Sequence, residues 1–163
     1  MLEQLPDHGL RWLAALAAVG AIIREALRVD RGDDVVASAR DDAYSVARHG
    51  GDEFAVALTL GNATAIGHVA PRIKRSADDV QLQRAHGYIG PPELTIAIGG
   101  VAYEAPPTIP GMTPGAIANA LLAAADTLMY GSKRDGLVHV AFAHYTDKLE
   151  VHGEQLLTTN AND

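Results

Sequence analysis

The pattern of apolar and polar positions along the chain predicts helices that alternate with short strands. Residues 10–29 are rich in Ala and Leu, which favours a helix in spite of Gly20. Strands are predicted where apolar and β-branched residues gather between turn signals. The predicted elements are a helix over 10–29, hairpin strands over 43–48 and 54–58, a helix over 63–76, a strand over 93–98 continuing through 101–103, a helix over 113–132 and a strand over 138–142.

This order of elements predicts an α/β fold in which helices cover a central mixed β-sheet. Pro71 falls inside the second helix and is expected to kink it. Residues 31–42 are expected to form a charged loop and residues 81–92 to be irregular. We expect the folded domain to span residues 1–145, followed by a polar tail over 146–163 without a strong pattern.

Composition and charge narrow the class of protein. With 163 residues, 48% of them hydrophobic, the chain can form one domain with a real core. The absence of cysteine excludes disulfides and is consistent with a cytoplasmic protein. The apolar stretch 10–23 is interrupted by Arg11 and Gly20, so a buried amphipathic helix is predicted rather than a membrane anchor. The formal net charge of −7 argues against a nucleic-acid partner.

The run Gly50-Gly51-Asp52-Glu53-Phe54 carries the clearest chemistry in the sequence. Two glycines allow a tight turn and a close approach of the backbone to a nucleotide, while adjacent carboxylates supply the hard oxygen ligands that magnesium prefers. Gly-Gly-Asp is also a common hairpin turn, so the run alone leaves a site and a structural turn equally open.

Three further blocks extend the resemblance that this run suggests. Leu94–Gly99 looks like a strand of the type LTVSIG, Ala125–Lys133 looks like a helix of the type ADxALYxAK, and Val69–Ile73 is similar to a helix of the type VAERI. Together with the turn, these blocks resemble the GGDEF family, the diguanylate cyclases, in the same order along the chain. The resemblance implies the GGDEF fold.

The resemblance also implies a reaction and the residues that perform it. Cyclases of this family join two GTP molecules on two facing domains to form cyclic di-GMP, which requires metal ligands, a guanine pocket and cations on the phosphates. Asp52 matches the family's metal ligand in the turn, Glu53 is the adjacent acid, and Lys133 matches the phosphate-binding lysine. Magnesium is therefore expected only together with bound GTP.

Several positions depart from the family's pattern. Leu13 stands where the family has its guanine-reading Asp, and Leu137 stands where it has a second phosphate cation. The strand that carries the other metal-binding carboxylate would lie before Met1, so we expect an N-terminally truncated fold. Asp52 without that partner holds magnesium poorly, and we expect Asp52 and Glu53 to be vestigial, with no appreciable condensation of GTP.

Members of the family also have a separate site for cyclic di-GMP, written RxxD ahead of the turn. Arginine can pair with the Hoogsteen edge of guanine and a carboxylate can accept from its N–H groups. Either Arg31 with Asp34 forms a displaced version of this site, or Arg40 forms one with Asp41 or Asp42. Arg72 matches the helix arginine that supports the site in relatives. Charges on a solvated loop are the alternative interpretation of each residue.

Three hypotheses follow, in order of preference. The first is a binding module, a degenerate GGDEF domain that senses cyclic di-GMP and passes the signal on by association. The second is an active cyclase whose missing strand is supplied by residues outside this sequence, and the third is an interaction domain without a nucleotide ligand. The first helix has few polar positions and is expected to support a homodimer. Apart from His139 and His144, no histidines have the spacing of metal ligands, so no zinc site is expected.

Overall fold

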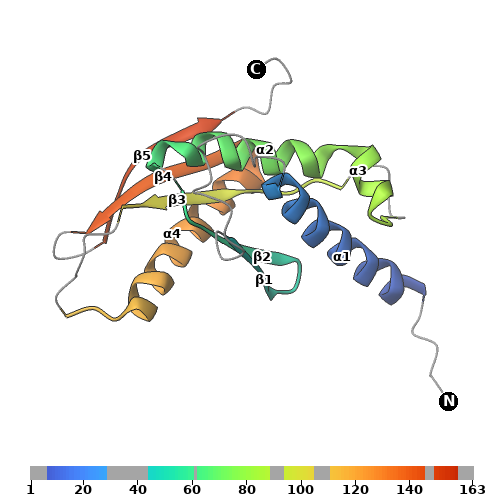
Figure 1. Cartoon of the computed structure of the whole chain (residues 1–163), viewed down its shortest axis with the longest axis horizontal. Helices are drawn as coiled ribbons and strands as arrows, with labels where there is room; N and C mark the ends of the chain where they lie inside the picture. The colour runs from blue at the N-terminus through green and yellow to red at the C-terminus, as the bar shows by residue number, and fades with distance from the viewer. Residues whose placement is uncertain are drawn as a thin grey trace.

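The structure is a computed structural model that describes residues 7–28, 44–60, 62–88, 94–104, 111–145 and 149–157 (Figure 1). Side chains are described throughout these ranges except at residues 7–14, 28, 145 and 149. The elements are α1 (Asp7–Arg28), β1 (Tyr44–Gly50), β2 (Glu53–Leu58), the 3-10 helix η1 (Ala63–Ala65), α2 (Ile66–Asp78), α3 (Val80–Ala85), β3 (Gly99–Tyr103), α4 (Pro114–Asp135), β4 (Val138–Tyr145) and β5 (Leu149–Leu157).

The described strands form two separate sheets. Strands β1 and β2 make an antiparallel pair, and a three-stranded sheet has the order β3-β4-β5. Within the second sheet β3 runs parallel to β4, while β5 runs antiparallel to it, so this sheet is mixed, as predicted. The α/β class is confirmed, although the strands described do not join into a single central sheet.

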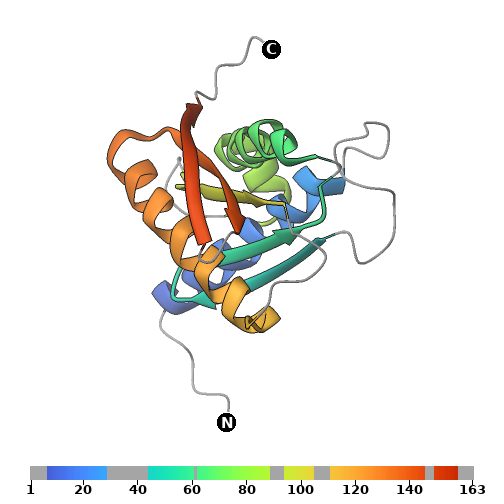
Figure 2. The same cartoon turned by 90° about the vertical axis from the view of Figure 1, so that its left-hand side faces the viewer.

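Helices cover both faces of the three-stranded sheet (Figure 2). On one face, Ile66 and Ala70 of α2 pack with Val138 and Val140 of β4 in a buried apolar cluster. On the other face lies α4, because the neighbouring residue His139 contacts Asp135 at the end of that helix. Alternation of side chains along β4 thus separates the α2 layer from the α4 layer.

A second core lies between α1, α2 and the β1–β2 hairpin. Its buried members are Val19, Ile23, Ala26, Leu27, Val69 and Ile73. Half-buried apolar residues of the hairpin and of segment 94–98 pack against them. In its described part, the first helix therefore buries apolar residues between Leu16 and Leu27 inside this chain, so these residues are not free to form the expected homodimer. Among the described helices, none combines the length and hydrophobicity that a membrane span requires.

The boundaries of α4 follow from its end residues. Thr113 accepts a hydrogen bond from the Ala116 N–H through its hydroxyl, and Pro114 occupies the first turn. At the other end Gly136 adopts the left-handed conformation with φ 75°, and its N–H donates to the Ser132 carbonyl. The helix thus begins where the sequence predicts and ends three residues later than predicted, at Asp135.

Three local predictions were wrong. Residues predicted to be irregular contain α3, whose start is marked by Asp79, which accepts hydrogen bonds from the N–H groups of Gln81 and Leu82. The predicted tail contains β5, which pairs with β4 along its length. Segment 94–98 is not assigned to a strand, and only its continuation, β3, belongs to the sheet. The helix that includes Pro71 is formed as predicted.

Side chains hold segment 94–98 where a strand partner would normally do so. The Gln83 amide donates to the Leu94 carbonyl at 2.9 Å, and the buried Lys74 ammonium donates to the Ile96 carbonyl at 3.1 Å. The Ser132 hydroxyl accepts from the Ile98 N–H at 3.0 Å. Alternate backbone groups of the segment are therefore satisfied from α2, α3 and α4.

A β-bulge divides strand β5. Phe142 is paired with His152 but Val140 is paired with Gln155, so the register shifts between these pairs. Gly153 lies at the shift with φ 64°, a conformation that favours glycine. Directly opposed residues share a face of the sheet, so the bulge places His152 on the Val140 face and Glu154 on the His139 face.

Candidate functional site

The Gly50-Gly51 turn joins β1 to β2, as the sequence predicts. Gly51 has φ 43°, in the left-handed region. The Arg48 guanidinium donates two hydrogen bonds to the Gly51 carbonyl, from Nε at 3.0 Å and from Nη2 at 2.7 Å. A β-carbon added at either glycine would meet no described atom within 4 Å. Arg48 thus restrains the turn, and the described atoms leave free space next to both glycines.

Two predicted site residues from distant parts of the sequence come together at this turn. The Lys133 ammonium, from the last turns of α4, lies 3.9 Å from the Glu53 carboxylate, and both side chains are about half exposed. Asp52 is exposed next to them. The arrangement places one cation and two carboxylates at the surface, where a phosphate or a hard cation could reach them.

Phe54 anchors the turn to the core. Its ring is half buried among the apolar residues that α1 and α2 contribute, and it lies against Gly20 of α1, where an added β-carbon would be 3.5 Å from the ring. The last residue of the motif therefore has a packing role. It fixes the hairpin against α1 and so positions the carboxylates that precede it.

Arg72 lies on α2 beside a second arginine. Burial lowers the pKa of Arg72, and the positive charge of Arg75 lowers it further. Both effects act against the charged guanidinium, which nevertheless stays protonated.

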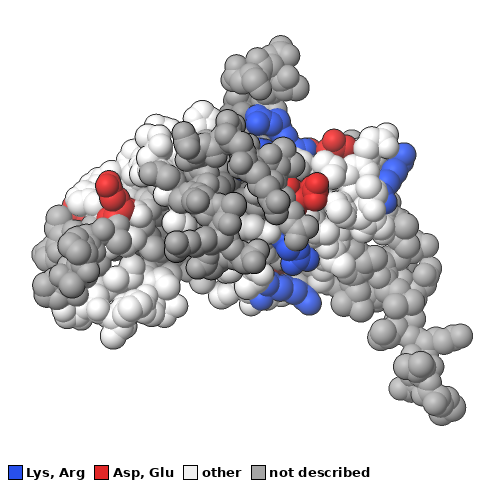
Figure 3. Space-filling model, in the orientation of Figure 1, with Lys and Arg blue, Asp and Glu red and all other residues white. Residues whose placement is uncertain are grey.

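The remaining predicted ligand residues, Arg31, Asp34, Arg40 and Asp41, lie outside the described residues. Leu13 is within α1, but its side chain is not among those described. The predicted cyclic di-GMP site is therefore represented in the structure by Arg72 alone. On the face drawn in Figure 3, the described basic side chains lie in small separate groups, with acidic residues nearby.

The structure separates His139 and His144, the two histidines that have ligand spacing in the sequence. His139 and His144 do not act together, because they project from opposite faces of β4. His139 is buried, with Nδ1 2.8 Å from Glu154 and Nε2 2.9 Å from Asp135. His144 instead lies with Glu150 and His152, three groups whose ligand atoms are within 4.8 Å of one another. The sequence paired His139 with His144, whereas the structure places His144 beside His152, because the β4–β5 hairpin was not predicted.

The comparisons with known proteins agree with the motifs. The family model described as diguanylate cyclase, GGDEF domain, matches residues 16–138, which is most of the chain. The match includes the glycine turn, α2, segment 94–98 and α4. No curated protein and no solved structure matches the chain significantly. The matched region and the geometry of the turn together show that the chain belongs to the GGDEF family of diguanylate cyclase domains.

Proposed function

We propose that the chain is a catalytically degenerate GGDEF domain that binds cyclic di-GMP as a receptor or regulatory module. The family uses GTP with magnesium and is connected with cyclic di-GMP. The observation that carries the proposal is the arginine pair on α2, in which Arg72 is partly withdrawn from water next to the charge of Arg75. Cyclic di-GMP brings two phosphodiesters and two guanines, and guanidinium groups bind both in bidentate fashion.

The remaining contacts would come from the segment that precedes the turn. Arg31 with Asp34, or Arg40 with Asp41, would supply an arginine and a carboxylate for guanine, as the family's RxxD does. Arg72 would then support the ligand from α2. This division of roles predicts that both α2 and one of the two upstream pairs contribute to affinity.

The geometry of the turn supports the loss of catalysis. Glu53 faces the Lys133 ammonium at 3.9 Å, so a magnesium ion at Glu53 would have to compete with a positive charge already there. Asp52 alone offers few of the oxygen ligands that magnesium needs. Leu13 and Leu137 cannot replace the guanine-reading acid and the phosphate cation of the family.

Calorimetry with cyclic di-GMP, and separately with GTP and magnesium, tests the proposal. Cyclic di-GMP is expected to bind and GTP to bind weakly or not at all. Arg72→Lys keeps the charge but removes bidentate pairing, which is worth about 1–3 kcal/mol, so affinity should fall roughly fivefold to 150-fold. Arg84→Lys, on the exposed surface of α3, is the matched control and should leave affinity unchanged.

Separate replacement of Arg31 and Arg40 by alanine locates the guanine contact. Loss of affinity in one variant assigns the upstream pair, and thermal melting checks that each variant is folded. If cyclic di-GMP fails to bind, or if Arg72→Lys binds like the parent chain, the proposed receptor function is wrong. Absence of binding to both nucleotides would favour an interaction domain without a nucleotide ligand.

A second candidate, an active diguanylate cyclase, is favoured by one contact. Lys133 lies at the glycine turn, where the family's lysine meets phosphate. Incubation of the chain with GTP and magnesium distinguishes the candidates: no cyclic di-GMP is expected from a degenerate domain. If the parent chain forms cyclic di-GMP and Lys133→Ala does not, the chain is an active cyclase and the proposal of a degenerate domain is wrong.

A homodimer is part of the same proposal. Association of two copies would give a receptor domain a means of passing on the binding of its ligand. Light scattering with and without cyclic di-GMP measures this directly. A chain that stays monomeric in both conditions would exclude signalling by self-association.

A further inference from the structure

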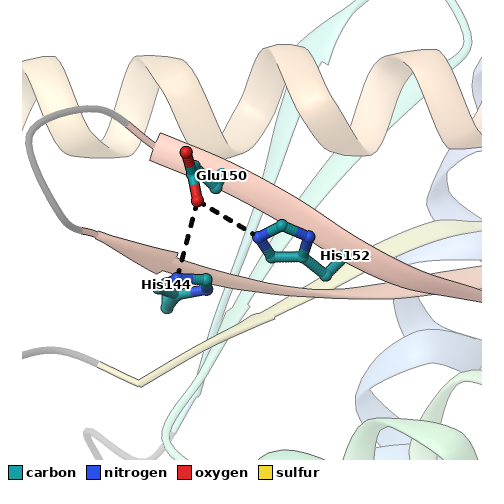
Figure 4. Close-up of side chains that lie close together, drawn as sticks. All are labelled: His144, Glu150 and His152. Carbon is teal, nitrogen blue, oxygen red and sulfur yellow. Dashed lines mark ion pairs between the residues drawn. The ribbon is translucent and has the colours of Figure 1, made fainter.

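Three side chains with metal-binding atoms converge on the exposed part of the β4–β5 hairpin (Figure 4). The Glu150 carboxylate lies between two imidazoles, 3.7 Å from His144 Nε2 and 3.4 Å from His152 Nε2. The two rings are stacked, with centroids 4.8 Å apart and an angle of 24° between their planes. This cluster lies apart from the glycine turn and is unrelated to the nucleotide chemistry proposed for it.

The backbone accounts for this convergence. His144 and Glu150 are directly opposed in the antiparallel register, so their side chains stand on the same face. His152 follows Glu150 by two residues and returns to that face. The bulge begins only after His152, at Gly153, so it leaves the three residues aligned. Two hydrogen-bonded strands therefore hold the donors, which are not carried by a loop.

The donor set selects a particular class of metal ion. Two imidazoles and one carboxylate suit zinc, whereas magnesium and calcium take oxygen ligands. In tetrahedral zinc sites with bonds of about 2.0–2.2 Å, neighbouring ligand atoms are about 3.4 Å apart. Both carboxylate–imidazole separations lie close to that value, at 3.4 and 3.7 Å. Small rotations of the half-exposed rings would bring the third pair of ligand atoms, the imidazole nitrogens of His144 and His152, to a similar separation.

The buried histidine nearby lacks this arrangement. The two ring nitrogens of His139 point to different carboxylates, Glu154 on one side and Asp135 on the other. These atoms cannot converge on one ion, because an imidazole offers its two nitrogens in divergent directions. The comparison shows that histidine–carboxylate contacts in this sheet do not all have metal-site geometry.

We propose that His144, Glu150 and His152 form a zinc site on the β4–β5 hairpin, with water or a partner's ligand in the fourth position. Ion pairs among exposed groups contribute little stability by themselves, so the cluster gains little from its own charges. Zinc would join the two strands close to their terminal pair, Tyr145 with Leu149. Bound metal would then stabilise β5 against separation from the sheet.

The test is zinc titration by calorimetry of the metal-stripped chain, with any affinity tag removed. One zinc ion per chain is expected to bind in a saturable way. His144→Ala and His152→Ala should each weaken binding at least about tenfold, because each removes one of only three protein ligands. Glu150→Gln preserves shape but loses the anionic ligand and should weaken binding as well.

The matched control is His68→Ala, since His68 is an exposed histidine on α2 outside the cluster. It should bind zinc like the parent chain. Cobalt used as a probe should give the visible absorption of a tetrahedral site in the parent and in His68→Ala, and lose it in His144→Ala. Circular dichroism establishes that the variants are folded. Zinc binding that is absent from the parent, or equal in all variants, would overturn the proposal.

Discussion

At the scale of single residues, Gly99 sets the distance between β3 and α4. A β-carbon at this position would overlap the backbone of Ala125 and Met129 in the middle of α4. The glycine that ends the LTVSIG-like block is therefore required by packing of the strand against the helix. Its place in a family motif reflects this close approach.

Replacement of Gly99 by alanine should be strongly destabilising. Because the obstructing atoms are backbone and cannot rotate away, we expect a loss of about 3 kcal/mol in the free energy of unfolding, at the upper end of overpacking effects. Chemical denaturation measures the change. Gly115→Ala is the control, since its β-carbon would enter open space near the start of α4 and alanine favours the helix. Equal stability of the two variants would contradict this account.

A second residue-scale feature is the charge state of His139. Burial of the ring lowers the pKa of His139, but its hydrogen bonds to Glu154 and Asp135, and their charges, outweigh burial and raise the pKa above its ordinary value of 6.5. The pKa of Asp135 is lowered, first by the hydrogen bond from the Leu137 N–H and then by His139. The protonated ring thus links the end of α4 to β5.

The sign of the pH dependence follows from these shifts. A histidine with a raised pKa in the folded state stabilises the fold fully below the unfolded pKa of 6.5 and loses this contribution as pH rises through the folded pKa. Asp135 contributes above its ordinary pKa of 3.8 and loses its contribution as pH falls through the lowered value. His139→Gln should therefore reduce the loss of stability measured by urea unfolding between about pH 6 and 8.

The control for this titration is His68→Gln, which changes an exposed histidine and should retain the slope of the parent chain. The difference between the two variants isolates His139 from the other histidines. Identical slopes in both variants would show that His139 does not carry the pH dependence.

At the scale of elements, segment 94–98 shows how a strand-like sequence is held mainly by side chains, with one backbone hydrogen bond to a strand, from the His139 N–H of β4 to the Ile98 carbonyl. Its alternating apolar residues pack against the core, although the strand that they predicted is not formed there. The sequence could not show that its backbone partners would be the side chains of Gln83, Lys74 and Ser132, because these lie far from it along the chain. Side-chain hydrogen bonds here replace most of the backbone hydrogen bonds that the predicted strand would have made.

Ser132 provides the clearest test of whether side-chain hydrogen bonds hold segment 94–98. In Ser132→Ala, the partly buried Ile98 N–H loses its acceptor, which should cost about 1–3 kcal/mol in unfolding free energy. Thr127→Ala, on the exposed side of the same helix, removes a hydroxyl that donates to the Ala123 carbonyl of its own helix. This control should change stability by less than about 0.5 kcal/mol. A similar loss in both would argue against a special role for Ser132.

At the scale of the whole molecule, the sequence predicted the parts better than their assembly. The helices and the glycine hairpin have strong local signals, such as the Thr113-Pro114 start of α4, and these were confirmed. Lys133 and Glu53 were assigned to one site by family resemblance, and they do meet. Strand β5 was missed because its polar residues lie on exposed positions of an edge strand, which leaves little apolar pattern to detect.

The two sheets should differ in local stability. Strand β4 is central, hydrogen-bonded to both β3 and β5, with Val138, Val140 and Ala141 fully buried. Among the described strands, β1 pairs only with β2, and it is largely exposed. Hydrogen exchange followed by mass spectrometry should show β4 as the slowest region and β1 as much faster, because exchange follows local opening. Equal protection of the two strands would contradict this division.

The bulge at Gly153 has a consequence for how this sheet could change during evolution. Beyond it, every residue of β5 stands on the face opposite to the one that simple alternation would give. Deletion of Gly153 alone would remove the extra residue and restore simple alternation, so Glu154 would stay on the His139 face and Leu156 and Leu157 would keep their sides. The faces of β5 would therefore survive the loss of this glycine, and the titration of His139 followed by NMR would report whether its contact with Glu154 is kept in such a variant.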